Sequence, residues 1–358
     1  MRRSTVISVA LCVVVPLASA CDDADGTGAG GSGASGSGST SSAGPTSTGT
    51  QTGATSGSGA VTSSGASMST GTGTPGGDPC SGNPFTPTTP GTGQGTEPPS
   101  SSAEQHQARL AVDALRNLIG LPPIAFNAAL NQASQAHSDY CTANPSLCPG
   151  WHQETAGAPG FTGVNFFDRD SAAGYNGNPR FEVMASGLGA DGSIQEWVET
   201  VYHRTPFITP DMGETGFGHA AAYDTMDFGN GQAADPAFVT NYPVHGQKGV
   251  PVSFGGNEGP TPPAPPAGFP SGSVISIIFP SAGVHITKHD LFDSSCASLP
   301  HVAGGQDLPA AGFQQGFLGP TVVLYANAPL ASGASYTVNV EYTLNGQPGH
   351  RTFQFTTQ

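Results

Sequence analysis

The residues whose types and spacing point most directly to chemistry are Cys141 and Cys148, which flank a short loop containing Asn144-Pro145. Two thiols this close in sequence form either a local disulfide or two ligands of a metal ion, and His152 would supply a third ligand. We expect the disulfide and keep the Cys-Cys-His metal site as its alternative. The disulfide requires an oxidising compartment, so this expectation depends on export of the chain.

The first 20 residues have the features of an export signal. Two arginines precede an apolar run from Val6 to Leu17, which is too short to span a bilayer comfortably. The run ends in Ala-Ser-Ala-Cys21, which looks like the lipobox of a bacterial lipoprotein, where the Cys carries the lipid and becomes the first residue of the mature chain. We expect a signal peptide over 1–20, lipidation at Cys21, and attachment to a bacterial membrane or cell surface. The alternative is ordinary cleavage after Ala20 and secretion.

Export leaves four cysteines, of which Cys80 and Cys296 either pair with each other or stay free. Residues 21–100 are rich in Gly, Ser and Thr and cannot bury enough apolar surface to offset their ordering entropy. We predict a disordered tether there, with a root-mean-square reach of roughly 50 Å. With 25 acidic against 10 basic residues the net charge is −15, which argues against nucleic acid as a partner.

Three helices are predicted after the tether. The first ends before Gly120, and its apolar face consists of Ala108, Val112, Leu115 and Ile119. The second begins after an N-cap at Asn127. The third opens at Ser193, because Ser193 and Glu196 have the spacing of a capping box.

The last hundred residues are predicted to form strands. Residues 251–272 are rich in Gly and Pro and are expected to be an interdomain linker. Strands are expected over 274–279, 321–325 and 335–344, with a turn at Asn345-Gly346 and a return strand after it. The pattern indicates a small all-β sandwich over 273–358, and its final strand resembles that of bacterial Ig-like modules.

Between these regions an ordered series of motifs resembles the CAP (SCP/PR-1-like) superfamily, its bacterial branch in particular. The motifs are Arg116-Asn117, Gly120 to Pro123, Asn127, Leu130, Ala136 to Tyr140, Asp168-Arg169, Ala172 to Tyr175, Glu182 within 181–187, Trp197, His203-Arg204, Pro210 and Gly216 to Gly218. The resemblance implies a CAP domain over 101–250, built as an α/β/α sandwich around a mainly antiparallel sheet. The whole chain is then an α+β protein, with the disordered tether before this domain and the Ig-like β-sandwich after it. Asp168 and Arg169 are expected to form a structural pair.

The resemblance also implies a cleft holding two His and two acidic residues. Carried over by position, His152, Glu182 and His203 are the candidate catalytic and metal-binding residues. Imidazoles and carboxylates together suit zinc or another divalent cation, and without a metal they could polarise a water as acid and base. Thr200 stands where the family has its second Glu, so the fourth cleft acid is expected to be Glu199 or Glu154.

Three functions follow as expectations. The first is an exported, lipid-anchored binding module for a small apolar or lipid ligand or an extracellular partner, with a metal optional. The second is a metal-assisted extracellular hydrolase, peptidase-like, using His152, Glu182 and His203. The third is a stable structural head. Fold resemblance alone does not decide among them.

Overall fold

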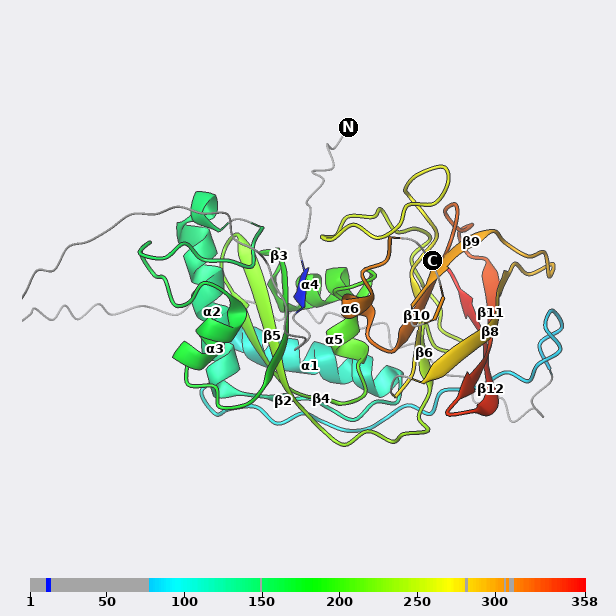
Figure 1. The fold of residues 1–358 in the computed structure, drawn as a ribbon, viewed down its shortest axis with the longest axis horizontal. Coiled ribbons are helices and arrows are strands. Elements are labelled where there is room, and N and C mark those ends of the chain that lie inside the picture. Colours follow the sequence, from blue (N-terminus) through cyan, green and yellow to red (C-terminus); the bar gives the residue numbers. More distant parts are fainter. Residues whose placement is uncertain (1–10, 14–76, 149, 281–282, 306, 309–311) are drawn as a thin grey trace, which may run out of the picture. The chain divides into compact units, whose positions relative to one another are not determined.

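The computed structural model describes residues 11–13, 77–148, 150–280, 283–305, 307–308 and 312–358 (Figure 1). The predicted lipidation site Cys21, most of the signal peptide and the tether up to residue 76 lie outside these residues. Within the described ranges, no helix has the length and apolar character needed to cross a membrane.

Helix α1 (Ala103–Leu118) follows the predicted pattern. The Ser102 side chain accepts a hydrogen bond from the Gln105 backbone N–H. The Gln105 side chain in turn accepts one from the Ser102 backbone N–H, which completes a capping box at the start of the helix. Ala108, Val112 and Leu115 are buried along one face. Gly120 has a φ of +75°, a conformation in which a side chain would be strained, so the helix ends where the sequence predicted.

Helix α2 (Ala128–Ala143) begins after Asn127, whose side chain accepts from the Ala129 N–H, as predicted. It lies directly on strand β4 (Met212–His219). A Cβ on Gly216 would approach the Leu130 carbonyl carbon to 2.1 Å, and one on Gly218 would approach that of Ser134 to 2.2 Å. The two glycines of this motif therefore allow a helix and a strand to pack backbone against backbone.

The central sheet has the order β1-β3-β5-β4-β2 and is antiparallel except for the parallel pair β2 and β4. Its other strands are β1 (Leu11–Val13), β2 (Ala125–Phe126), β3 (Pro179–Ser186) and β5 (Tyr223–Gly231). Helices α2 and α3 (Phe166–Ala172) pack on one side, and α1 and α4 (Gly189–Val198) pack against each other and the sheet (Figure 1). The predicted mainly antiparallel sheet with helices around it is confirmed, with the short α5 (Thr205–Ile208) and the 3-10 turn Pro145–Leu147 as additions.

The start of α4 differs from the prediction. The helix begins at Gly189, not at Ser193, and the predicted capping box is wrong. The Gly189 N–H donates to Asp224 at 2.8 Å, and the Ala190 N–H donates to Glu104 at 3.0 Å. These carboxylates, remote in sequence, satisfy the free N–H groups of the first turn, and Ser193 donates to Asp224 instead. Glu196 is thereby left without a capping role.

The C-terminal strands form two antiparallel sheets with the orders β6-β7-β10-β9 and β12-β11-β8. Their bounds are β6 Thr240–Tyr242, β7 Ile275–Ile278, β8 Val284–Phe292, β9 His301–Gly304, β10 Thr321–Ala326, β11 Ser335–Leu344 and β12 Gln347–Thr356, with a short α6 at Gln315–Leu318. The hairpin turn is confirmed, because Asn345 and Gly346 have φ values of +52° and +78° between β11 and β12. The all-antiparallel character agrees with the sequence pattern, and the Ig-like assignment stays a prediction.

Two segments with linker-like composition are attached to the rest of the protein. Within 77–100, the last part of the predicted tether, Cys80 forms a disulfide with Cys296, and Asn83 donates to Asn339 and Glu341. Within the predicted linker 251–272, the backbones of Phe254 and Ser271 bond to each other in both directions. Strand β6, placed by the prediction in the CAP domain, pairs with β7 of the C-terminal sheet. Residues 77–100 and 251–272 are therefore held in place by backbone hydrogen bonds and a disulfide, which apolar periodicity in the sequence does not reveal.

Candidate functional site

His152 lies in the loop before α3 and is held by Glu182 of β3. Its Nδ1 lies 2.8 Å from Glu182 Oε1, and both side chains are buried. Arg169 of α3 donates to the other Glu182 oxygen and, at 3.2 Å, to the His152 carbonyl. Burial alone would raise the pKa of Glu182, but Arg169 and the nearby histidines outweigh it and hold the pKa far below its usual range. Glu182 is therefore an ionised carboxylate that orients His152, and Arg169 is bound to Glu182 rather than to Asp168.

His203 lies in the turn after α4 and has an acidic partner of its own. Its Nδ1 lies 3.1 Å from Oε2 of Glu258, which is 2% exposed. The sequence analysis missed Glu258 because it lies in the predicted linker, far from the family motifs. One signal was available: Glu258 is the only charged residue of segment 251–272.

The two imidazoles share a further property at Nε2. In the part of the chain that the structure describes, His152 Nε2 and His203 Nε2 are buried and have no hydrogen-bond partner. A carboxylate at Nδ1 accepts a hydrogen bond from that nitrogen, so in a neutral ring Nε2 carries the free lone pair. Burial lowers the pKa of His152, the Glu182 carboxylate opposes this, and the positive charges of His203 and His137 lower the pKa further.

Glu196 adds a third unpartnered atom next to His203. Its Oε2 is buried without a hydrogen-bond partner among the described residues. Burial raises the pKa of Glu196, and the neighbouring His203 partly opposes this. The side chain also lines an open pocket of about 340 Å³ that Leu188 and Asn257 border. Glu196 thus lines a surface pocket and interacts electrostatically with His203.

The two acids predicted to complete the cleft have other partners. Glu154 pairs with Nδ1 of His137 at 2.9 Å and accepts from the Thr162 N–H. Glu199 ends α4 and accepts from Gln195 at 3.2 Å. The Thr200 hydroxyl donates to the Trp197 carbonyl at 2.7 Å. The carboxylates beside the two site histidines are instead Glu182 and Glu258.

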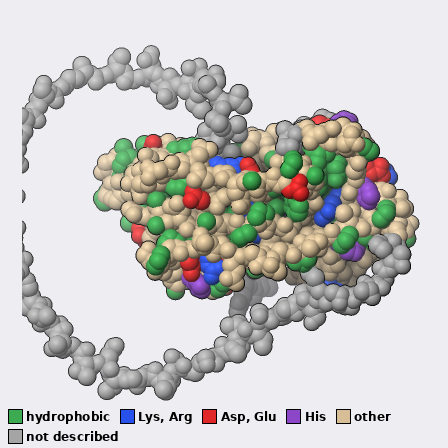
Figure 2. Space-filling model, turned by 90° about the horizontal axis from the view of Figure 1, so that it is seen from below, with side chains coloured by type: hydrophobic (Ala, Val, Ile, Leu, Met, Phe, Trp, Pro, Cys, Tyr) green, Lys and Arg blue, Asp and Glu red, His purple; other side chains and the backbone are tan. Residues whose placement is uncertain are grey.

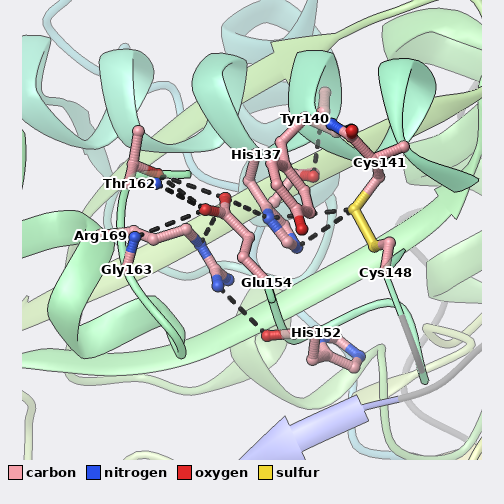
Figure 3. A network of polar contacts seen from close by, with 12 residues as sticks. His137, Tyr140, Cys141, Cys148, His152, Glu154, Thr162, Gly163 and Arg169 are labelled. Atoms are coloured by element: carbon pink, nitrogen blue, oxygen red, sulfur yellow. Dashed lines mark hydrogen bonds and ion pairs between the residues drawn. A yellow bond between two sulfur atoms is a disulfide. The ribbon is translucent and has the colours of Figure 1, made fainter. Parts of the chain in front are cut away.

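The structure joins Cys141 to Cys148 in a disulfide, next to His137 rather than His152 (Figure 3). Donor atoms of these three residues lie within 4.8 Å of one another. The sulfurs are bonded to each other, and His137 Nε2 faces the Trp151 carbonyl at 2.7 Å while Nδ1 faces Glu154. Both ring nitrogens of His137 are thus at hydrogen-bond distance from acceptor oxygens. The Cys-Cys-His alternative therefore does not fit the oxidised protein.

A pair of buried aspartates lies behind the His152 half of the site. Asp170 has no hydrogen-bond partner for either carboxylate oxygen among the described residues, and Asp227 has none for Oδ1. Burial raises the pKa of Asp170 to about 8, with the negative charge of Glu182 adding to the effect and Arg169 opposing it. Burial also raises the pKa of Asp227, and Asp170 and Glu182 add to it. Burial therefore favours the neutral form of both carboxyls.

Charged side chains are few on the protein surface shown in Figure 2. Figure 2 shows one face of the protein on which charged side chains are scattered and basic ones are few. No basic patch gathers there, in agreement with the acidic composition. This face therefore offers nothing suited to phosphate neutralisation.

Comparisons with known proteins place the fold. Residues 110–239 match the CAP family, described as the cysteine-rich secretory protein family. No curated protein matches the chain. Among solved structures, an extracellular protein containing an SCP domain from Bacillus anthracis str. Ames matches with 16% identity and a TM-score of 0.31, covering 36% of this chain and 40% of that one. At that TM-score the structural likeness carries no weight, so the assignment of residues 110–239 rests on the family match.

The match shows a CAP domain over residues 110–239 and confirms, for that region, the resemblance carried by the sequence motifs. The matched region contains His152, Glu182, Glu196 and His203, whereas Glu258 lies beyond its end. The two disulfides fit an extracellular protein.

Proposed function

We propose that this protein is an exported CAP-domain binding module in which His152 and His203 hold a divalent cation, with zinc the best fit. The observation that carries the proposal is that the two imidazole rings have the same hydrogen-bonding arrangement. Each ring has Nδ1 on a buried carboxylate and a buried Nε2 without a partner. Histidine ligands of metals characteristically have this carboxylate support, which fixes the tautomer and the ring orientation.

The residues present fit the two-imidazole part of a metal site. Zinc is bound by neutral imidazole nitrogens, and Glu196, whose Oε2 is buried without a hydrogen-bond partner among the described residues, interacts electrostatically with His203. Among the described residues, no set of three donors that includes both histidines lies within 4.8 Å. The site is therefore a pair of oriented imidazoles that a cation would draw together with Glu196. A bound cation would supply a positive charge that polarises an oxygen atom of a ligand.

A second pocket supports a small apolar or lipid ligand. It has a volume of about 310 Å³ and lies where α1, α4 and residues 242–251 meet, lined in part by Ala111, Leu115, Ile194, Val198 and Tyr242. It shares Gln195 and Glu199 with the pocket that Glu196 borders. Apolar lining with a few polar groups is typical of ligand sites. With a lipid on Cys21, such a module would act at the bacterial surface.

The alternative is a metal-assisted, peptidase-like hydrolase. Glu196 favours it, because a carboxyl whose pKa is raised by burial beside an imidazole is suited to proton transfer. Glu182 does not serve as its base, since Arg169 and His152 occupy both of its oxygens. Zinc-dependent cleavage of a peptide or ester panel that is lost in Glu196→Gln would establish the hydrolase. Retention of a fluorescent fatty acid without any turnover would establish the binding module.

Zinc titration calorimetry tests the cation directly. The protein is the chain from Asp22 to Gln358, which lacks the predicted signal peptide and with it β1. The comparison is His152→Ala/His203→Ala, with the exposed His106→Ala as the control. We expect saturable binding to one site in the parent and the control, and none in the double variant. Equal binding in all three proteins, or none in the parent, would reject the proposal.

A further inference from the structure

We infer that Glu258 is the positioning residue of His203, so that a segment beyond the CAP-family region completes the CAP site. The inference rests on the proposed function for the role of Nε2, but its geometry stands independently. The family match ends at residue 239, and Glu258 belongs to the stretch that composition assigned to a free linker.

Glu258 binds the turn after α4 through three donors from consecutive residues. Its Oε1 accepts from the Val201 N–H at 2.7 Å, and its Oε2 accepts from the Tyr202 N–H at 2.9 Å. The same Oε2 lies 3.1 Å from His203 Nδ1. A carboxylate that receives two backbone N–H groups is an acceptor only, so the hydrogen at the third contact belongs to the imidazole. Glu258 therefore sets both the conformation of the turn and the tautomer of His203.

The C-terminal sheet in turn holds Glu258. Phe254 pairs through its backbone with Ser271, and its ring packs edge-on against Tyr325 of β10 and against Phe269. The Glu258 N–H donates to the Gly256 carbonyl at 3.0 Å. The carboxylate is thus presented by a folded loop of the β-region rather than by a flexible connection.

The same turn has two more attachments to the β-region. Arg204 donates to the Val274 carbonyl at 2.9 Å and to the Ser276 hydroxyl of β7 at 3.0 Å. The Tyr202 hydroxyl accepts from the Gln314 N–H at 3.0 Å. Three consecutive residues, Tyr202 to Arg204, are therefore fixed from outside the CAP-family region. A CAP domain cut at the predicted boundary, residue 250, would lose every one of these contacts.

Nitrogen-15 NMR of the histidine rings tests the inference in the chain from Asp22 to Gln358. In the zinc-free parent we expect His203 to carry its proton on Nδ1. In Glu258→Gln we expect that tautomer to lose population, and zinc affinity to fall by about 10- to 100-fold, the range for lost carboxylate support of a metal-binding His. Glu258→Asp keeps a carboxylate and should therefore retain part of the Nδ1-protonated population and part of the zinc affinity that Glu258→Gln loses. Glu97→Gln is the matched control, because Glu97 also accepts from a His Nδ1, that of exposed His106.

Each outcome decides one point. If His203 in the parent protein carries its proton on Nε2, the inference is wrong. This measurement needs no variant, so it tests the inference even if Glu258→Gln does not fold. An unchanged tautomer and zinc affinity in folded Glu258→Gln overturn it too. If the parent binds no zinc but Glu258→Gln still shifts the His203 tautomer, the proposed function fails and the positioning role stands.

Discussion

His152 and His203 each have Nδ1 at hydrogen-bond distance from a buried carboxylate, yet the two halves of the site are built differently. The His152 half is internal to the CAP region, and the charge of Glu182 is balanced by the buried Arg169. The His203 half has no such cation in the contacts described, and Glu258 is satisfied there by two backbone N–H groups. The comparison shows that one tautomer can be imposed either by a buried charge network or by a turn fixed from another region.

The largest expected effect comes from removing the cation of the His152 half. Arg169→Met leaves Glu182 buried with its charge unbalanced and takes a charge partner from Glu154, 3.9 Å away. Loss of one partner from a buried ion pair costs about 3–5 kcal/mol. Urea unfolding should therefore show a large loss of stability. Arg180→Met, at a partly exposed ion pair with Asp211, is the control and should cost less than about 1 kcal/mol. Equal losses in the two variants would contradict this account of the His152 half.

A smaller effect is expected from pH, and it also belongs to the His152 half. Burial raises the pKa of Asp170 from 3.8 to about 8, so the folded state holds this proton more tightly than the unfolded state. The stabilising contribution is complete below about pH 4 and is lost as the pH rises toward and through about 8. Asp170→Asn should remove this dependence, so the stability of the variant relative to the parent should rise with pH. Parallel pH–stability curves for parent and variant would show that Asp170 is not the cause.

The local parts of the fold could be predicted from sequence because their causes are local. The apolar face of α1, the Asn127 cap of α2 and the Asn345-Gly346 turn each depend on residues within a few positions of one another. The start of α4 could not be predicted, because Asp224 and Glu104 satisfy its first turn from distant positions. The local capping signal at Ser193 was outcompeted by these tertiary contacts.

The candidate site divides in the same way. His152, Glu182 and His203 could be placed from the family resemblance, and the structure puts all three in buried positions with Glu182 on His152. Glu258 could not be found, because its distance in sequence from His203 is bridged only by the folding of a Gly/Pro-rich loop onto the β-region. The attachment of residues 77–100 was hidden for the same reason, since it depends on the Cys80–Cys296 disulfide and on contacts to β11.

The most direct test of the central claim is a crystal structure of the zinc-soaked protein with anomalous data at the zinc edge. The account predicts one strong zinc peak about 2.0–2.1 Å from both His152 Nε2 and His203 Nε2, with Glu182 and Glu258 still on the two Nδ1 atoms. A peak at another group of histidines, or a site in which either Nε2 remains without the metal, would contradict it.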